Sequence, residues 1–288
     1  AELQRPVSVA AAQPPTLADV QATLTAGEAW VQYHLLADRW LAVVLTRDRR
    51  HWHEGAVEGL SDRLESLRFQ LDAVRGRPPG LQAHGALLAE RTRRHLQALH
   101  ERLWAPLEAS LAGCSRVRIA PHRLLHYLPW AALHDGQGWL VDRFEISLVP
   151  SARIGLGTTA SAAPRFDRVL ALGIGGSSLP HVTTEARAVA EAFGAGATLL
   201  LDAEATGAAL RREAPLADLL HLACHAQFRA DSPYFSALHL ADGELTLRDA
   251  AALPLRAALV TLSACETGLS RVAPGDELVG LVRGFLLA

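Results

Sequence analysis

The chain has 288 residues, of which 50% are hydrophobic, 20% are charged and 6% are aromatic. This composition is typical of a folded protein of about two domains and excludes a disordered chain. The net charge is only −2, so no overall basic field favours nucleic acid or an anionic membrane surface as a partner.

The termini and the cysteine content bear on where the protein works. No stretch resembles a secretion signal, and no apolar run reaches the roughly 18 residues that a membrane-spanning helix needs. Three cysteines in the whole chain favour a reducing compartment over a disulfide scaffold, so we expect a cytoplasmic protein without a membrane partner. The chain begins at Ala1 and ends inside a predicted helix at Ala288, which we interpret as a piece of a longer protein.

Residues 1–113 are predicted to form a smaller α+β region. Thr16 precedes the first helical pattern and is a candidate helix cap, with Asp19 three residues later. Hydrophobic patterning then predicts a short helix, a hairpin and two longer helices, at residues 17–27, 29–36 with 40–46, 60–74, and 81–111 with an interruption near Pro106. The region holds no dense cluster of reactive side chains, so we assign it no chemistry.

The pattern changes after Gly113, and residues 114–288 are predicted to form a second domain. Six short apolar segments are predicted strands, at residues 117–120, 144–149, 168–173, 197–201, 218–224 and 258–263. Between them lie predicted helices and one inserted hairpin, at residues 184–193, 205–212, and 237–240 with 244–247. Continuous apolar strands that alternate with helices favour an α/β fold, with a mostly parallel sheet covered by helices on both faces.

Two predicted strands end in residues capable of nucleophilic chemistry. The fifth strand is followed by His225, and the sixth is followed by Cys265 in a turn that ends at Gly268. Reactive groups of a parallel sheet gather at the carboxyl ends of its strands, and the spacing leaves room for a hairpin and one helix between adjacent strands. An imidazole beside a thiol takes its proton and produces the reactive thiolate. We therefore predict a Cys-His dyad.

Each of these residues also has an ordinary structural interpretation. Taken alone, Cys265 fits a small core hydrophobe, and His225 fits a surface or capping residue. A structural zinc site would use His221, Cys224, His225 and Cys265. His221 and Cys224 point to opposite faces of a strand, however, and no CxxC pair exists, so we expect no metal.

Two further kinds of site are disfavoured by their motifs. Residues 173–176 form a G-x-G-G stretch after a strand, but the full dinucleotide fingerprint and a following GK[ST] are absent. We interpret this stretch as a mobile loop and expect no cofactor. The chain has no G-x-S-x-G motif, which argues against a serine hydrolase.

Several ordered motifs resemble those of the CHAT domain, a caspase-like domain of clan CD cysteine peptidases that is often joined to tetratricopeptide or other repeats. The matching segments are His221–Ala226, Leu262–Gly268, Gly275–Glu277, Ile119–Leu133, Val149–Ser151 and Glu204–Thr206. The resemblance covers nearly the whole chain, including the hairpin region. It implies a caspase-like peptidase domain over residues 114–288. The family continues past the helix at 280–286, so the resemblance also implies a domain truncated at its C-terminus.

The resemblance assigns the roles in a peptide-bond hydrolysis. His225 is the expected general base and Cys265 the nucleophile, with the backbone N–H groups of Ala226 and Cys265 stabilising the oxyanion. The family usually has glycine where this chain has Ala226, and alanine restricts the positive φ that glycine allows. Because the sequence contains no asparagine, a Cys-His-Asn triad is excluded, and a two-residue dyad acting through a thioester is the simpler expectation.

The sequence also offers candidate residues for substrate binding and suggests what partners to expect. Asp231, Glu266 and Asp276 lie in predicted loops at the active end of the sheet, where one could receive a basic side chain; each also fits a solvated loop charge or a helix-capping charge. Ser236 matches a recurrent serine of the family and is expected to support loop geometry. The expected partners are a protein or peptide substrate and a regulatory repeat domain or activating protein, in prokaryotic defence or regulation. The alternative function is a caspase-like module of weak or no activity that only binds partners.

Overall fold

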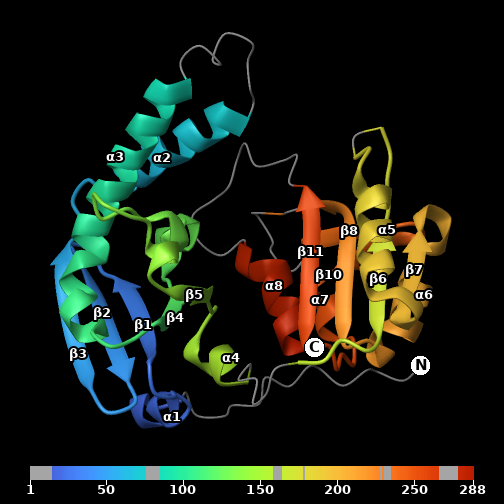
Figure 1. Cartoon of the computed structure of the whole chain (residues 1–288), viewed down its shortest axis with the longest axis horizontal. Helices are drawn as coiled ribbons and strands as arrows, with labels where there is room; N and C mark the ends of the chain where they lie inside the picture. Colours follow the sequence, from blue (N-terminus) through green and yellow to red (C-terminus); the bar gives the residue numbers. More distant parts are fainter. Residues whose placement is uncertain are drawn as a thin grey trace. The chain divides into compact units, whose positions relative to one another are not determined.

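The computed structural model describes residues 15–75, 85–157, 164–177, 179–227, 229, 235–265 and 278–288. These residues form two compact units, and the division falls at Gly157. Each unit is built on its own sheet (Figure 1). None of the helices within the described residues combines the length and the hydropathy needed to cross a membrane.

The first unit contains a five-stranded sheet in the order β3-β2-β1-β4-β5. The predicted hairpin is confirmed: β1 and β2 pair antiparallel, and β3 extends them as a meander, while β4 and then β5 add in parallel on the other side of β1. The bounds are Glu28–Leu35, Arg39–Thr46, Arg50–Ala56, Arg116–Ala120 and Glu145–Leu148 for β1 to β5.

Helices cover this sheet and bury an apolar core against it. α2 contributes Leu60, Leu64 and Leu67, and α3 contributes Leu99 and Leu103, to a cluster that also holds buried tryptophans. Thr16 and Asp19 form the expected capping box at the start of the first helix. The helical bounds are Leu17–Ala22 for α1, Leu60–Arg75 for α2, Gly85–Leu103 for α3 and Ala152–Gly157 for α4. Short 3₁₀ turns lie at Ala105–Leu111, Arg123–Tyr127, Trp130–Ala132 and Leu140–Asp142.

The second unit contains a mixed sheet whose centre is parallel. Its parallel strands run in the order β7-β6-β8-β11, and the β9–β10 hairpin joins through antiparallel pairing of β9 with the last residues of β8. The strand bounds are Val169–Gly173, Ala197–Leu201, Leu219–Gln227, Ala237–Leu240, Gly243–Thr246 and Leu259–Cys265 for β6 to β11. The helices are α5 Val182–Phe193, α6 Gly207–Glu213, α7 Leu247–Ala251 and α8 Leu278–Leu287, with 3₁₀ turns at Gly194–Gly196, Asp202–Glu204 and Ala214–Leu216.

Helices pack on both faces of the second sheet, as predicted. On one face, Val182 at the start of α5 and Leu179 just before this helix pack against Ala223 of β8. On the other face, α6, α7 and α8 share one apolar cluster with β6 and β8, through Leu210, Ala250, Phe285, Leu172 and Leu222 among others. The α/β fold, with helices and two mixed sheets, is therefore confirmed.

Two predicted strands belong to another sheet than the one expected. The segments 117–120 and 144–149 were expected in the second sheet, but they correspond to β4 and β5 of the first. Their apolar pattern is the same in either sheet, so it cannot identify the partner strand. The helices α2 and α3 form the crossover that a parallel β1–β4 pair requires.

One strand was missed altogether. The sequence of β3, RHWHEGA, is mostly polar and charged and alternates between exposed and half-buried positions at the edge of its sheet. Edge strands commonly carry such charges, which discourage pairing with other chains. Hydrophobic patterning alone therefore does not identify β3.

Candidate functional site

The carboxyl ends of β8 and β11 are adjacent, because these two strands are parallel neighbours (Figure 1). Their register pairs His225 with Cys265, and pairs Ala223 with Ser263 two residues earlier. The two positions predicted to form the dyad are thus brought together at the level of the backbone. The side chain of Cys265 lies outside the described part of the chain.

Alternation along β8 explains which residues share a face with His225. Leu220, Leu222 and Cys224 belong to the buried apolar cluster on one face. Successive residues of a strand point to opposite faces, so the row that contains His221, Ala223 and His225 faces the other way, toward α5. The apolar residues of the sequence LLHLACHAQ therefore anchor one face in the core and assign the histidines to the opposite face.

The same alternation continues in β11. Val260, Leu262 and Ala264 pack against the same apolar cluster. The register therefore puts position 265 in the row of Thr261 and Ser263, beside the His225 row of β8. Thr261 is exposed and Ser263 is half-buried, so this row of β11 is partly open to solvent.

His221 lies in the same row as His225 but has a different environment. It is only 5% exposed, and its Nε2 lies 3.2 Å from Oε1 of Glu185 on α5. Cys224 belongs to the opposite face, as expected from strand alternation. Within the described residues no group of three or more histidine, cysteine or acidic side chains is arranged to hold a metal ion.

Two further thiols provide a comparison for Cys265. Cys224 is fully buried beside His225, and burial raises the pKa of its thiol to about 12. Burial also raises the pKa of the Cys114 thiol in the first unit, which nearby Arg49 partly offsets. At neutral pH both groups are therefore protonated and poor nucleophiles.

The strand that carries His225 is longer than the predicted segment 218–224. β8 continues to Gln227, and Ala226 pairs with Leu238 of β9. Among the described residues, Arg123 and Asp202 are the non-glycine positions with positive φ, so the backbone at Ala226 adopts no conformation that needs glycine. Alanine in place of the family's glycine consequently causes no strain here.

The other predicted substrate-binding residues divide into two groups. Ser236 is fully buried, and its hydroxyl accepts a hydrogen bond of 3.2 Å from the N–H of Arg229, while its carbonyl accepts one from Leu247. These contacts fit a role in holding the loop before β9. Asp231, Glu266 and Asp276 lie outside the described residues.

Sequence reasoning missed the contacts that fix the loop between β6 and α5. The N–H of Ile174 donates to the carbonyl of Ala223, and the N–H of Gly175 donates to Oδ1 of Asp202 at 3.0 Å. Asp202 follows β7 and has φ of 46°, an uncommon value for a residue other than glycine. The G-x-G-G stretch is thus tied to β8 and to the residue after β7, the two strands that flank β6. The one clue in the sequence is that Asp202 directly follows a predicted strand.

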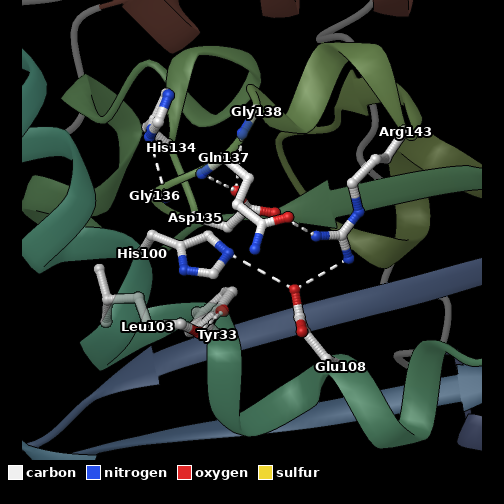
Figure 2. Close-up of polar contacts among 10 residues, drawn as sticks. All are labelled: Tyr33, His100, Leu103, Glu108, His134, Asp135, Gly136, Gln137, Gly138 and Arg143. Atoms are coloured by element: carbon white, nitrogen blue, oxygen red, sulfur yellow. Dashed lines mark hydrogen bonds and ion pairs between the residues drawn. The ribbon is translucent and has the colours of Figure 1, made fainter.

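A cluster of charged groups in the first unit was also absent from the predictions. Figure 2 shows Arg143 between two carboxylates, 2.9 Å from Oε1 of Glu108 and 2.8 Å from Oδ2 of Asp135. Buried His100 approaches the same Glu108 oxygen at 3.5 Å, and burial lowers the pKa of this histidine. The cluster connects α3 and the following 3₁₀ turn to the loop that carries Asp135, which indicates a structural role.

We expect Asp135→Asn to remove a pH-dependent part of the stability. The N–H groups of Gly138 and Gln137, together with Arg143, hold the pKa of Asp135 at about 2, against an ordinary 3.8. A lowered pKa stabilises the fold at higher pH, and this contribution is lost as the pH falls from about 4 to about 2. The variant should lose about 1 to 2 kcal/mol of unfolding free energy at pH 7. Chemical unfolding at several pH values measures the difference. A gap that stays constant down to pH 2 would contradict this origin.

Comparison with known proteins identifies one family. A model of the CHAT domain matches residues 93–288, which is more than half of the chain and includes all of the second sheet. The match begins within α3, so it also includes β4 and β5 of the first sheet. No curated protein matches the chain.

Proposed function

Since the chain belongs to the CHAT domain family, which is caspase-like and related to cysteine peptidases, we propose that it is a cysteine endopeptidase. Cys265 is the nucleophile and His225 is the general base. The observation that carries the proposal is the register of β8 and β11, in which these residues are partners at the carboxyl ends of adjacent parallel strands.

Strand geometry supports a direct contact between the two groups. Neighbouring strands lie about 4.8 Å apart, and paired positions of parallel strands belong to the same face of the sheet. An imidazole and a thiol at such positions are within reach of a shared proton. Hydrophobic side chains on the opposite face hold both strands, so the pair is carried by rigid elements.

The proposed reaction proceeds through two acyl transfers. His225 takes the proton of Cys265, and the thiolate attacks the peptide carbonyl carbon to give a tetrahedral oxyanion. The N–H groups of Ala226 and Cys265 stabilise this oxyanion, an effect typically worth a few kcal/mol. The protonated His225 then donates its proton to the leaving amine as the C–N bond breaks, which leaves a thioester. Water, deprotonated by His225, attacks the thioester and releases the carboxylic acid and the free thiol.

The substrate is proposed to be a protein or peptide whose side chain meets the loops beyond β8 and β11. Asp231, Glu266 and Asp276 remain the candidates to bind a basic side chain. Buried Ser236 supports the loop that follows β8 through the N–H of Arg229. A regulatory repeat domain or another activating partner would control access to the site. No cofactor takes part in the reaction.

Selective alkylation of the three thiols tests the activated nucleophile. At pH 7 an iodoacetamide probe should label Cys265 faster than Cys224 and Cys114, whose thiol pKa values are raised by burial. Peptide mass spectrometry of time points gives the three rates separately. We expect labelling of Cys265 to slow by about tenfold or more in His225→Ala, because the base that forms the thiolate is lost.

The two other thiols act as internal controls, since each variant reports all three rates in the same sample. Labelling of Cys265 that is as slow as that of Cys224, or that is unchanged in His225→Ala, would contradict the dyad. The chain would then be better explained as a caspase-like module that binds partners without hydrolysing them.

A further inference from the structure

The outer halves of α2 and α3, defined as residues 68–71 and 85–95, differ from the rest of these helices. The inner halves bury Leu60, Leu64 and Leu67 of α2 and Leu96, Leu99 and Leu103 of α3. In the outer halves no described side chain is buried (Figure 1 shows the two helices side by side). Tertiary packing usually stabilises a helix by covering its apolar side chains, and in this part of the hairpin the described apolar side chains are not fully covered.

Apolar side chains lie open along this part of the hairpin. Phe69 is 75% exposed and Leu87 is 51% exposed. Phe69 and Leu88 line a cleft of about 450 Å³ between the two helices, together with Arg91 and four other polar residues, Glu65, Ser66, Gln70 and His95. A cleft of this size with an exposed aromatic group at its wall is typical of an interaction surface.

Charge indicates what kind of partner fits the cleft. Arg91 has no hydrogen bond or ion pair to any described side chain, whereas Arg93 and Arg94 both pair with Glu90. Burial, and then nearby Arg63, lower the pKa of His95, so this ring is uncharged at neutral pH. With Glu65 and Ser66 of the cleft wall included, this surface contains four arginines and two glutamates, a net charge of +2, while the chain as a whole has a net charge of −2. The surface is therefore locally basic, and its unpaired cation stands at the cleft.

We propose that the cleft between the outer halves of α2 and α3 binds an acidic amphipathic helix of a partner protein. The side chains of α2 and α3 form two ridges, and a third helix can pack in the groove between them. An extended peptide would instead need a free strand edge, which a pair of helices does not offer. The apolar row of that helix covers Phe69 and Leu88, and a carboxylate beside the row pairs with Arg91. The proposal concerns the first unit alone and does not depend on peptidase activity.

A pair of matched probe peptides tests the proposal on the full chain. The acidic probe is a helical peptide of about 18 residues with leucines at i, i+4, i+7 and i+11 and glutamates on both flanks. Its twin carries lysine in place of every glutamate. Fluorescence anisotropy should give a dissociation constant at least about tenfold lower for the acidic probe, because only it complements Arg91.

Variants assign the binding to the cleft. Phe69→Ser should weaken binding of the acidic probe by about tenfold or more, and Arg91→Glu should reverse the preference between the two probes. Arg248→Glu makes the same charge change at an exposed position of the second unit and should leave both constants unchanged. Equal unfolding midpoints of all variants show that they remain folded.

Three outcomes would overturn the proposal. They are no binding of the acidic probe, equal binding of the twin, and binding that Phe69→Ser and Arg91→Glu leave intact. Sedimentation velocity of the chain without peptide is run in parallel. A dimer that forms with rising concentration and is lost in Phe69→Ser would assign the cleft to a second copy of the chain, and would also overturn it.

Discussion

Cys265→Ala is expected to reduce hydrolysis of a peptide library by at least about a thousandfold, because the proposed nucleophile that forms the thioester is lost. His225→Ala should cause a loss of similar size. The double variant should be no less active than either single variant, since the two residues act as one unit and the remaining rate comes from binding and the oxyanion donors.

Cys224→Ala is the matched control for this experiment. It removes a thiol one residue from His225, but from the face of β8 that packs in the apolar core. We expect it to keep most of the activity and to lose only a small part of the stability. Substantial activity in Cys265→Ala, or a much larger loss in the double variant than in either single one, would rule out the dyad.

Gly173→Val is expected to destabilise the second unit by about 3 kcal/mol, because the position has no room for a side chain. A Cβ atom at Gly173 would lie 2.7 Å from Cβ of Ala186, 3.2 Å from Cδ2 of Leu201 and 3.3 Å from the carbonyl oxygen of Val182. Two of these groups belong to α5, and Ala186 is fully buried. α5 could make room for the new side chain only by moving away from the sheet. It would then lose contact with β6 and with β8, and β8 is the strand that carries His225.

Gly176→Val provides the comparison, three residues further along the same chain segment. A Cβ atom at Gly176 would meet no described atom within 4 Å, and its φ is not positive. Urea unfolding monitored by circular dichroism should show a small change for this variant and a large one for Gly173→Val. Similar changes in the two variants would show that close packing of α5 on β6 is not what stabilises the unit.

Much of the secondary structure could be predicted, because it follows from local patterns. The β1–β2 hairpin, α2, and the strands of the second unit lie within a few residues of their expected bounds. Apolar residues at helical or alternating spacing have to be buried, and this requirement acts over a few turns or one strand. β3 was missed for the same reason, since an exposed edge strand carries no such pattern.

The partners of β4 and β5 could not be predicted, because they depend on contacts between distant segments. The segments of β4 and β5 were expected in the same sheet as β6, yet β4 pairs with β1 and β5 pairs with β4 in the first sheet. The hydrogen bond between Gly175 and Asp202 and the cluster around Arg143 also join residues that are far apart in the sequence. No local pattern contains that information.

The sequence by itself determined that a histidine and a cysteine follow apolar segments of the strand type, in an order that resembles one family. The α/β pattern also favoured parallel, adjacent strands for these segments, but tertiary structure alone decided the register that pairs His225 with Cys265. The physical reason is that side-chain periodicity identifies a strand and its buried face, whereas the neighbour and the register are chosen by hydrogen bonding and packing across the whole sheet.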